Sequence, residues 1–124
     1  MSIRSKEPVI LVCDDEEGIR ESFKLILEDF YDLRFAKNGI EGLEMVKRSA
    51  PDLMFLDIKM PKQHGMDTLK KIKEARPDLP VVIVSGYQSV EIAQEAARYG
   101  ASDYIPKPFE SAQILRAAEN LTKK

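Results

Sequence analysis

Hydrophobic residues follow two alternating patterns along this chain. Short, mostly uninterrupted apolar runs predict buried strands, and each is followed by a segment whose apolar residues return every three or four positions, as on one face of a helix. The runs lie at residues 9–13, 33–36, 53–56, 79–84 and 101–106. The helical spacing is carried by Ile19, Phe23, Ile26, Leu27 and Phe30, by Ile40, Leu43 and Val46, by Met66, Leu69 and Ile72, by Ala93, Ala96 and Ala97, and by Ile114, Leu115, Ala118 and Leu121.

Residues with strong local preferences stand where these helices should begin and end. The carboxylates of residues 15–17 suit the N-terminus of the first helix. Ser89 is placed to cap the fourth helix, and Gly100 is placed to end it in a left-handed conformation. The second and third helices should end before Pro51 and Pro77, and the fifth should run to the end of the chain.

Five strands that alternate with five helices predict an α/β fold. Because the strands are almost continuously apolar, they should form a parallel sheet that helices cover on both faces, connected by right-handed crossovers. The predicted architecture is therefore a doubly wound five-stranded parallel sheet. In the order 2-1-3-4-5, the first and third strands flank the point where strand order reverses, and ligands bind at such a point.

Length and composition narrow the class of protein. The 124 residues fit one domain, predicted at residues 9–124 behind a flexible leader at residues 1–8. The net charge of -2 offers no broad basic face, so we expect no direct nucleic-acid binding. A single cysteine, Cys13, in an apolar strand excludes an intramolecular disulfide and suits a reducing cytoplasm. No apolar run is long enough to predict a signal peptide or a membrane span.

Polar residues that can handle phosphate follow four of the five predicted strands. Asp14 and Asp15 follow the first strand, Asp57 the third, Ser85 the fourth, and Lys107 the fifth. Like charges about 4 Å apart repel by roughly 4 kcal/mol at an effective dielectric near 20, so three clustered carboxylates call for a divalent cation. Oxygen ligands favour Mg2+, and one reachable carboxylate could then act as a nucleophile toward a phosphoryl group.

Each of these residues also has an ordinary structural explanation. Asp14 and Asp15 could serve only as an N-cap pair, Asp57 and Ser85 as turn residues, and Lys107 as a solvated charge. Their joint placement at one edge of one sheet favours a functional site over four coincidences.

This ordered set of residues resembles the receiver domain of bacterial two-component response regulators, and the resemblance covers nearly the whole chain. The ordered set of motifs is far more specific than any single member. The matching residues are Asp14-Asp15, Asp57 followed by Met60-Pro61 and Gly65, Ser85-Gly86, and the segment from Gly100 to Phe109.

The resemblance implies a flavodoxin-like fold in which Asp57 accepts a phosphoryl group from a phosphohistidine of a sensor histidine kinase. It further implies that Asp15, Asp57 and the backbone carbonyl of Lys59 hold Mg2+, with Asp14 assisting directly or through water. Lys107 would contact a phosphoryl oxygen, and a cis Lys107-Pro108 peptide bond would aim it into the pocket. The Ser85 hydroxyl would bond the phosphorylated site.

A switch follows from the same resemblance. When Ser85 moves, Tyr104 would enter the vacated space and change the face made by the fourth helix, fifth strand and fifth helix. Receivers commonly use that face for dimerisation or for contact with an output module or protein target. Such a chain promotes its own phosphorylation and dephosphorylation, and is not a turnover enzyme on an external substrate. Without the surrounding motif, Tyr104 would be an ordinary aromatic residue at a sheet edge.

The chain departs from the family pattern at Gln63-His64, where an acidic residue usually precedes the loop glycine; the isolated His64 is interpreted as a turn residue. Lys59 and Tyr87 occupy positions that tune phosphoryl lifetime in the family, and we hypothesise that Tyr87 shields the acyl phosphate from water. Residues 85–105 also resemble receivers of sigma-54-type activators. Because no output domain follows Lys124, we expect a stand-alone receiver or an excised N-terminal module.

Two further functions stay open. An aspartate-dependent phosphohydrolase of the haloacid dehalogenase type also combines Asp, Ser and Lys at strand ends. The nucleophile of such an enzyme resembles an Asp-x-Asp motif after the first strand, whereas this chain has the adjacent pair Asp14-Asp15 there. A degenerate receiver that only binds partners would not require Asp57, Ser85 and Lys107 together. Flavin binding is disfavoured because the acidic residues 14–17 would repel the flavin phosphate.

Overall fold

The computed structural model describes residues 7–59 and 65–122, and these contain five parallel strands in one sheet, ordered β2-β1-β3-β4-β5, together with five helices. The predicted doubly wound α/β fold and its strand order are confirmed. The strands are β1 Val9–Cys13, β2 Asp32–Ala36, β3 Leu53–Leu56, β4 Val81–Ser85 and β5 Asp103–Pro106. The helices are α1 Glu17–Leu27, α2 Gly39–Ser49, α3 Gly65–Ala75, α4 Val90–Arg98 and α5 Ser111–Thr122.

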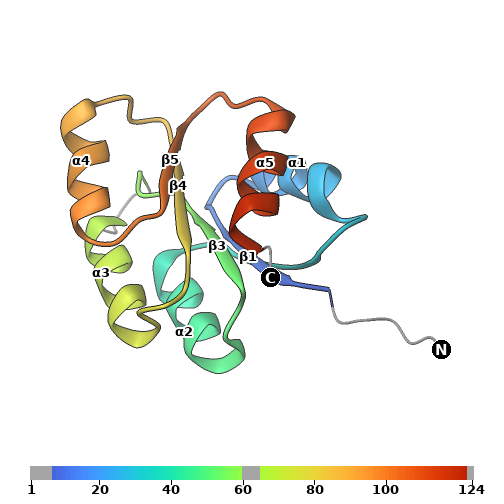
Figure 1. Ribbon diagram of the computed structural model, residues 1–124, viewed down its shortest axis with the longest axis horizontal. Coiled ribbons are helices and arrows are strands. Elements are labelled where there is room, and N and C mark those ends of the chain that lie inside the picture. The colour runs from blue at the N-terminus through green and yellow to red at the C-terminus, as the bar shows by residue number, and fades with distance from the viewer. Residues whose placement is uncertain (1–6, 60–64, 123–124) are drawn as a thin grey trace.

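Helices cover both faces of the sheet. Helices α1 and α5 lie side by side on one face, and α2, α3 and α4 cover the other (Figure 1). Along β1, Ile10 and Val12 join the core under α1 and α5, whereas Leu11 and Cys13 join the core on the opposite face. Successive strand residues point to opposite faces, so a strand that is covered twice is apolar at every position.

Aromatic packing ties α1 to the centre of the sheet. The ring of Phe23 on α1 lies 4.9 Å from that of Phe55 on β3 and 5.4 Å from that of Phe109, measured between centroids. Phe23 and Phe55 are each 1% exposed. Burial of one such side chain stabilises the fold by roughly 1.5–3 kcal/mol, so this contact anchors the helix that follows the first acidic motif.

The predicted ends of α4 are confirmed. The Ser89 hydroxyl accepts a hydrogen bond from the Ile92 amide at 3.3 Å, which satisfies a free donor of the first turn. Gly100 has a φ of +101°, a conformation that side chains with a Cβ rarely adopt. Both features depend on local geometry alone, so they can be recognised without knowledge of the fold.

Three details of the sequence prediction are wrong. Helix α1 ends at Leu27, and Phe30 lies beyond it with 59% of its surface exposed, because the chain must turn at once to begin β2. Strand β5 begins at Asp103 instead of residue 101, since the Ala101 amide is used to close α4 through the Ala96 carbonyl. Strand β4 begins at Val81, two residues later than predicted.

Some predictions fall outside the described residues. These are the first six residues of the predicted leader, the Met60-Pro61 pair, His64, and the last two residues of the fifth helical segment. Within the described ranges, no helix combines the length and the apolarity that crossing a membrane would require.

Candidate functional site

Backbone hydrogen bonds of the sheet continue past the strand ends and fix the acidic residues. The Asp14 amide donates to the Ala36 carbonyl of β2 at 3.0 Å, and the Asp57 amide donates to the Cys13 carbonyl of β1 at 3.0 Å. Cys13 pairs with Leu56 in the register of β1 and β3. The residues that follow, Asp14 and Asp57, are therefore neighbours at the carboxyl edge of the sheet, as predicted.

Lys107 is fixed at the same edge in the same way. Its amide donates to the Ser85 carbonyl at 2.8 Å, which extends the pairing of β4 and β5 by one residue. The peptide bond between Lys107 and Pro108 is cis, as the family resemblance implied.

The Lys107 ammonium contacts three carboxylates. Its Nζ atom lies 2.9 Å from Asp14 Oδ2, 3.1 Å from Asp57 Oδ2 and 3.1 Å from Glu16 Oε1. The side chains of Asp14, Asp57 and Lys107 are 3%, 4% and 14% exposed, whereas that of Glu16 is 62% exposed. Three of these four groups are thus withdrawn from water, and solvent and salt therefore screen their mutual interactions only weakly.

Burial and charge act together on the pKa values of this cluster. Burial lowers the pKa of Lys107. The hydrogen bonds and negative charges of Asp14 and Asp57 raise it by a larger amount, so the pKa of Lys107 lies above its ordinary range. Burial raises the pKa of Asp14, an effect that the Lys107 ammonium and the Glu16 amide offset in part. Lys107 is therefore held as a cation beside the acidic residues.

The acidic residues fit a magnesium ion. Asp14, Asp15 and Asp57 each bring a carboxylate oxygen to one place, and these atoms lie within 4.8 Å of one another. Hard oxygen ligands of this kind suit Mg2+. The amide of Lys59 donates to Asp57 Oδ1 at 2.8 Å, so Lys59 lies against the acidic cluster; the predicted role of its carbonyl as a ligand stays a prediction.

Ser85 and Tyr104 lie around the loop that follows β4. Ser85 is fully buried, and its hydroxyl accepts a hydrogen bond from the Tyr87 amide at 3.4 Å. The Tyr104 hydroxyl donates to the Tyr87 carbonyl at 2.8 Å. Burial raises the pKa of the Tyr104 phenol, although a hydrogen bond with Ser85 opposes this. The two predicted switch residues therefore both contact the backbone of Tyr87.

The side chains of this loop reach toward the acidic cluster. The Lys59 ammonium lies 5.3 Å from the centroid of the Tyr87 ring, a cation–π distance, and Tyr87 is 38% exposed. Gln88 donates from its side-chain amide to the Lys107 carbonyl at 2.9 Å. Tyr87 thus stands at the margin of the site, on the segment that also carries Ser85.

The sequence prediction missed Glu16 as a partner of Lys107. Its alternative explanation of Asp14 and Asp15, as an N-cap pair, is wrong. Glu16 occupies the N-cap position of α1, so Asp14 and Asp15 are not the N-cap. Asp14 instead accepts a hydrogen bond from the Glu16 amide at 2.9 Å. No spacing rule could have found the pair, because Glu16 and Lys107 are 91 positions apart.

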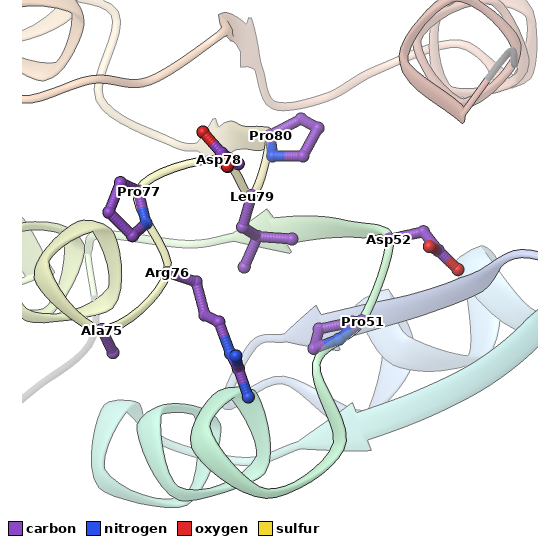
Figure 2. A pocket seen from close by; sticks show the side chains of 8 residues that line it. All are labelled: Pro51, Asp52, Ala75, Arg76, Pro77, Asp78, Leu79 and Pro80. Carbon is purple, nitrogen blue, oxygen red and sulfur yellow. The ribbon is translucent and has the colours of Figure 1, made fainter.

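A separate hollow of about 400 Å3 lies at the opposite edge of the sheet, before β3 and β4 (Figure 2). Two of its charged side chains, Asp52 and Arg76, already have partners. The Asp52 carboxylate accepts from the Val9 amide at 2.8 Å, and the Arg76 guanidinium donates to the Val46 and Lys47 carbonyls at 3.3 and 3.0 Å. The Asp52 contact links the start of β1 to the residue before β3, and the Arg76 contacts bind carbonyls in the last turn of α2. These two side chains therefore have structural roles in this region.

Comparison with known proteins identifies the family of this chain. The model of the response regulator receiver domain family matches residues 10–119. The response regulator MprA of Mycobacterium leprae (strain TN) is 34% identical over 116 residues, which are 93% of this chain and 51% of that protein. MprA of Mycobacterium ulcerans (strain Agy99) is 33% identical over 125 residues, with 52% of its length covered. The chain thus spans about half the length of the curated relatives it matches.

Solved structures give the same result. A CheY-like receiver domain protein from Methanospirillum hungatei JF-1 superposes with a TM-score of 0.87 at 32% identity, covering 94% of this chain and 93% of that one. The receiver domain of NtrX from Brucella abortus gives a TM-score of 0.85 at 38% identity, covering 93% and 98%. Because the family model matches residues 10–119, the chain belongs to the response regulator receiver domain family.

Proposed function

We propose that this chain is the phosphoacceptor module of a two-component system and that Asp57 receives a phosphoryl group from a phosphohistidine of a sensor histidine kinase. One observation carries the proposal: the buried carboxylate of Asp57 contacts the Lys107 ammonium and also belongs to the cluster with Asp14 and Asp15. A nucleophile, a fixed cation and ligands for a second cation thus converge at one place.

In the proposed transfer, a carboxylate oxygen of Asp57 attacks phosphorus. The oxygen–phosphorus bond forms as the nitrogen–phosphorus bond breaks, and the imidazole leaves with that electron pair. Oδ1 already accepts the Lys59 amide, whereas Oδ2 lies beside Lys107 Nζ. A phosphoryl group formed on Oδ2 would therefore have an ammonium beside its own oxygens.

Asp14, Asp15, Asp57 and the Lys59 carbonyl would hold Mg2+. When bound, this ion offsets the negative charge of the transferred group. Lys107 adds a compact positive charge, and its backbone is already held at this edge of the sheet before the reaction.

The output of this event would be a rearrangement around Ser85 and Tyr104. If the Ser85 hydroxyl turns to the phosphoryl group, it leaves the Tyr87 amide, and Tyr104 can leave the Tyr87 carbonyl to fill the space. Both changes act on the backbone before α4 and on β5. The face formed by α4, β5 and α5 would then change its affinity for an output module, a protein target or a second copy of the chain.

We place the module in the cytoplasm, where a sensor kinase can reach it and where the buried thiol of Cys13 stays reduced. Tyr87 is proposed to lengthen the lifetime of the acyl phosphate by limiting the approach of water. Its position at the margin of the site and its contact with Lys59 support this role.

The test is phosphorylation by acetyl phosphate and Mg2+, followed by mass measurement of the intact chain. The parent and Asp29→Asn, which removes an exposed carboxylate beyond the C-terminal end of α1, should each gain one phosphoryl group, whereas Asp57→Asn should gain none. Equal gain by Asp57→Asn would remove the assignment. Absence of beryllofluoride binding would indicate a silent interaction module, and repeated release of phosphate from a phosphomonoester would indicate a phosphohydrolase.

A further inference from the structure

The N-cap residue of α1 uses its side chain in an unusual way. An acidic N-cap residue ordinarily accepts a hydrogen bond from an amide of the first helical turn. Glu16 has the extended backbone of an N-cap, with φ of -94° and ψ of 120°, but its side chain makes no such bond. Its Oε1 atom instead lies 3.1 Å from Lys107 Nζ. The carboxylate therefore turns from its own helix toward the ammonium.

Asp14 connects the backbone of Glu16 with the same ammonium. Asp14 Oδ1 accepts from the Glu16 amide at 2.9 Å, and Asp14 Oδ2 lies 2.9 Å from Lys107 Nζ. One carboxylate thus orients the start of α1 and contacts Lys107. This arrangement places the Glu16 side chain on the solvent side of the ammonium, where it is 62% exposed.

Glu16 differs from the other partners of Lys107 because it is outside the acidic cluster. The cluster that can hold a divalent cation consists of Asp14, Asp15 and Asp57. A cation bound there would compete with Lys107 for the oxygens of Asp14 and Asp57 and would repel the ammonium. The Glu16 carboxylate can keep its contact with Lys107 under these conditions.

We propose that Glu16 is a positioning residue for Lys107. It retains the ammonium at the edge of the site when magnesium takes Asp14 and Asp57, and it yields the ammonium to the phosphoryl oxygens once Asp57 is modified. This inference rests on the proposed function of Asp57.

The proposal predicts opposite changes in two affinities. Without the Glu16 charge, Lys107 interacts more strongly with Asp14 and Asp57, so Mg2+ should bind more weakly. An acyl-phosphate mimic should bind more tightly, because no exposed carboxylate competes for the ammonium. A partly exposed charge pair corresponds to changes of about two- to fivefold in each affinity.

The experiment compares Glu16→Gln with Glu17→Gln in the 124-residue chain. Glu17 is an exposed acid of the same helical turn and has no ion pair among the described residues, so its variant measures the general effect of losing one charge. Mg2+ is titrated first and followed by amide NMR, and beryllofluoride is then titrated at saturating Mg2+. Glu16→Gln should show both shifts, and Glu17→Gln should change each affinity by less than about twofold.

A second pair of variants tests whether Glu16 acts through Lys107. In a Lys107→Met background, Glu16→Gln should alter Mg2+ affinity no more than Glu17→Gln does. Equal shifts for the two glutamate variants in the parent, or an undiminished effect of Glu16→Gln without Lys107, would overturn the proposal. If the parent binds no beryllofluoride, the proposed function of Asp57 fails, and the Mg2+ titrations still decide the role of Glu16.

Discussion

Substitution of Gly65 by alanine should destabilise the protein, although it replaces a helical glycine with the best helix former. A Cβ atom at Gly65 would lie 2.2 Å from the Cα atom and 2.4 Å from the carbonyl oxygen of Ile58. Both atoms belong to the backbone, so no side-chain rotation can relieve the clash. Ile58 directly follows Asp57, and the segment that carries the proposed phosphoacceptor would have to move.

The magnitude follows from two opposing effects. Overpacking in a close contact typically costs 1–3 kcal/mol, and the helix propensity of alanine returns at most about 1 kcal/mol. We therefore expect the free energy of unfolding of Gly65→Ala to fall by roughly 1–2 kcal/mol. Because the Asp57 backbone must shift, beryllofluoride affinity should fall as well.

Gly18 provides a matched control. It lies in the first turn of α1, and a Cβ atom there would meet no heavy atom within 4 Å other than those of its chain neighbours and of the backbone of its own helix. Gly18→Ala should therefore raise the free energy of unfolding by up to about 1 kcal/mol. Urea unfolding followed by circular dichroism measures both variants, with equal m-values expected. If Gly65→Ala is as stable as the parent or more stable, the close approach of Gly65 to Ile58 is refuted.

Three other predictions address different parts of the molecule. Burial raises the pKa of the Cys13 thiol from 9.0 to about 12, so the folded chain keeps this proton more tightly, and its free energy of unfolding should fall as the pH rises from about 9 toward 12. Urea unfolding of the parent and Cys13→Ala at about pH 8 and about pH 10 tests this, and equal pH dependence would contradict it. Arg76→Met should lose about 1 kcal/mol of stability, because the guanidinium bonds two carbonyls at the end of α2, whereas the exposed Arg48→Met should lose little; equal urea midpoints would count against this. Tyr87→Ala should shorten the life of the acyl phosphate after acetyl phosphate is removed, and an unchanged time course would argue against shielding from water.

The sequence alone determined the fold and the edge of the sheet where polar residues gather. Uninterrupted apolar runs predict strands covered on both faces, and the carboxyl ends of parallel strands meet at one edge. For this reason the sequence predicts Asp14, Asp57 and Lys107 together at this edge. Ser89 and Gly100 were predictable because a helix cap and a left-handed turn depend only on nearby backbone atoms.

Only the tertiary structure decided which partners these residues have. Helical spacing identifies an apolar face but not how far another element covers it, so Phe30 and Leu115 were predicted on buried faces and are 59% and 37% exposed. The contact of Glu16 with Lys107 and that of Tyr104 with the Tyr87 carbonyl join distant parts of the chain. Such contacts depend on where the sheet places each backbone and on side-chain direction, and neither is encoded in local periodicity.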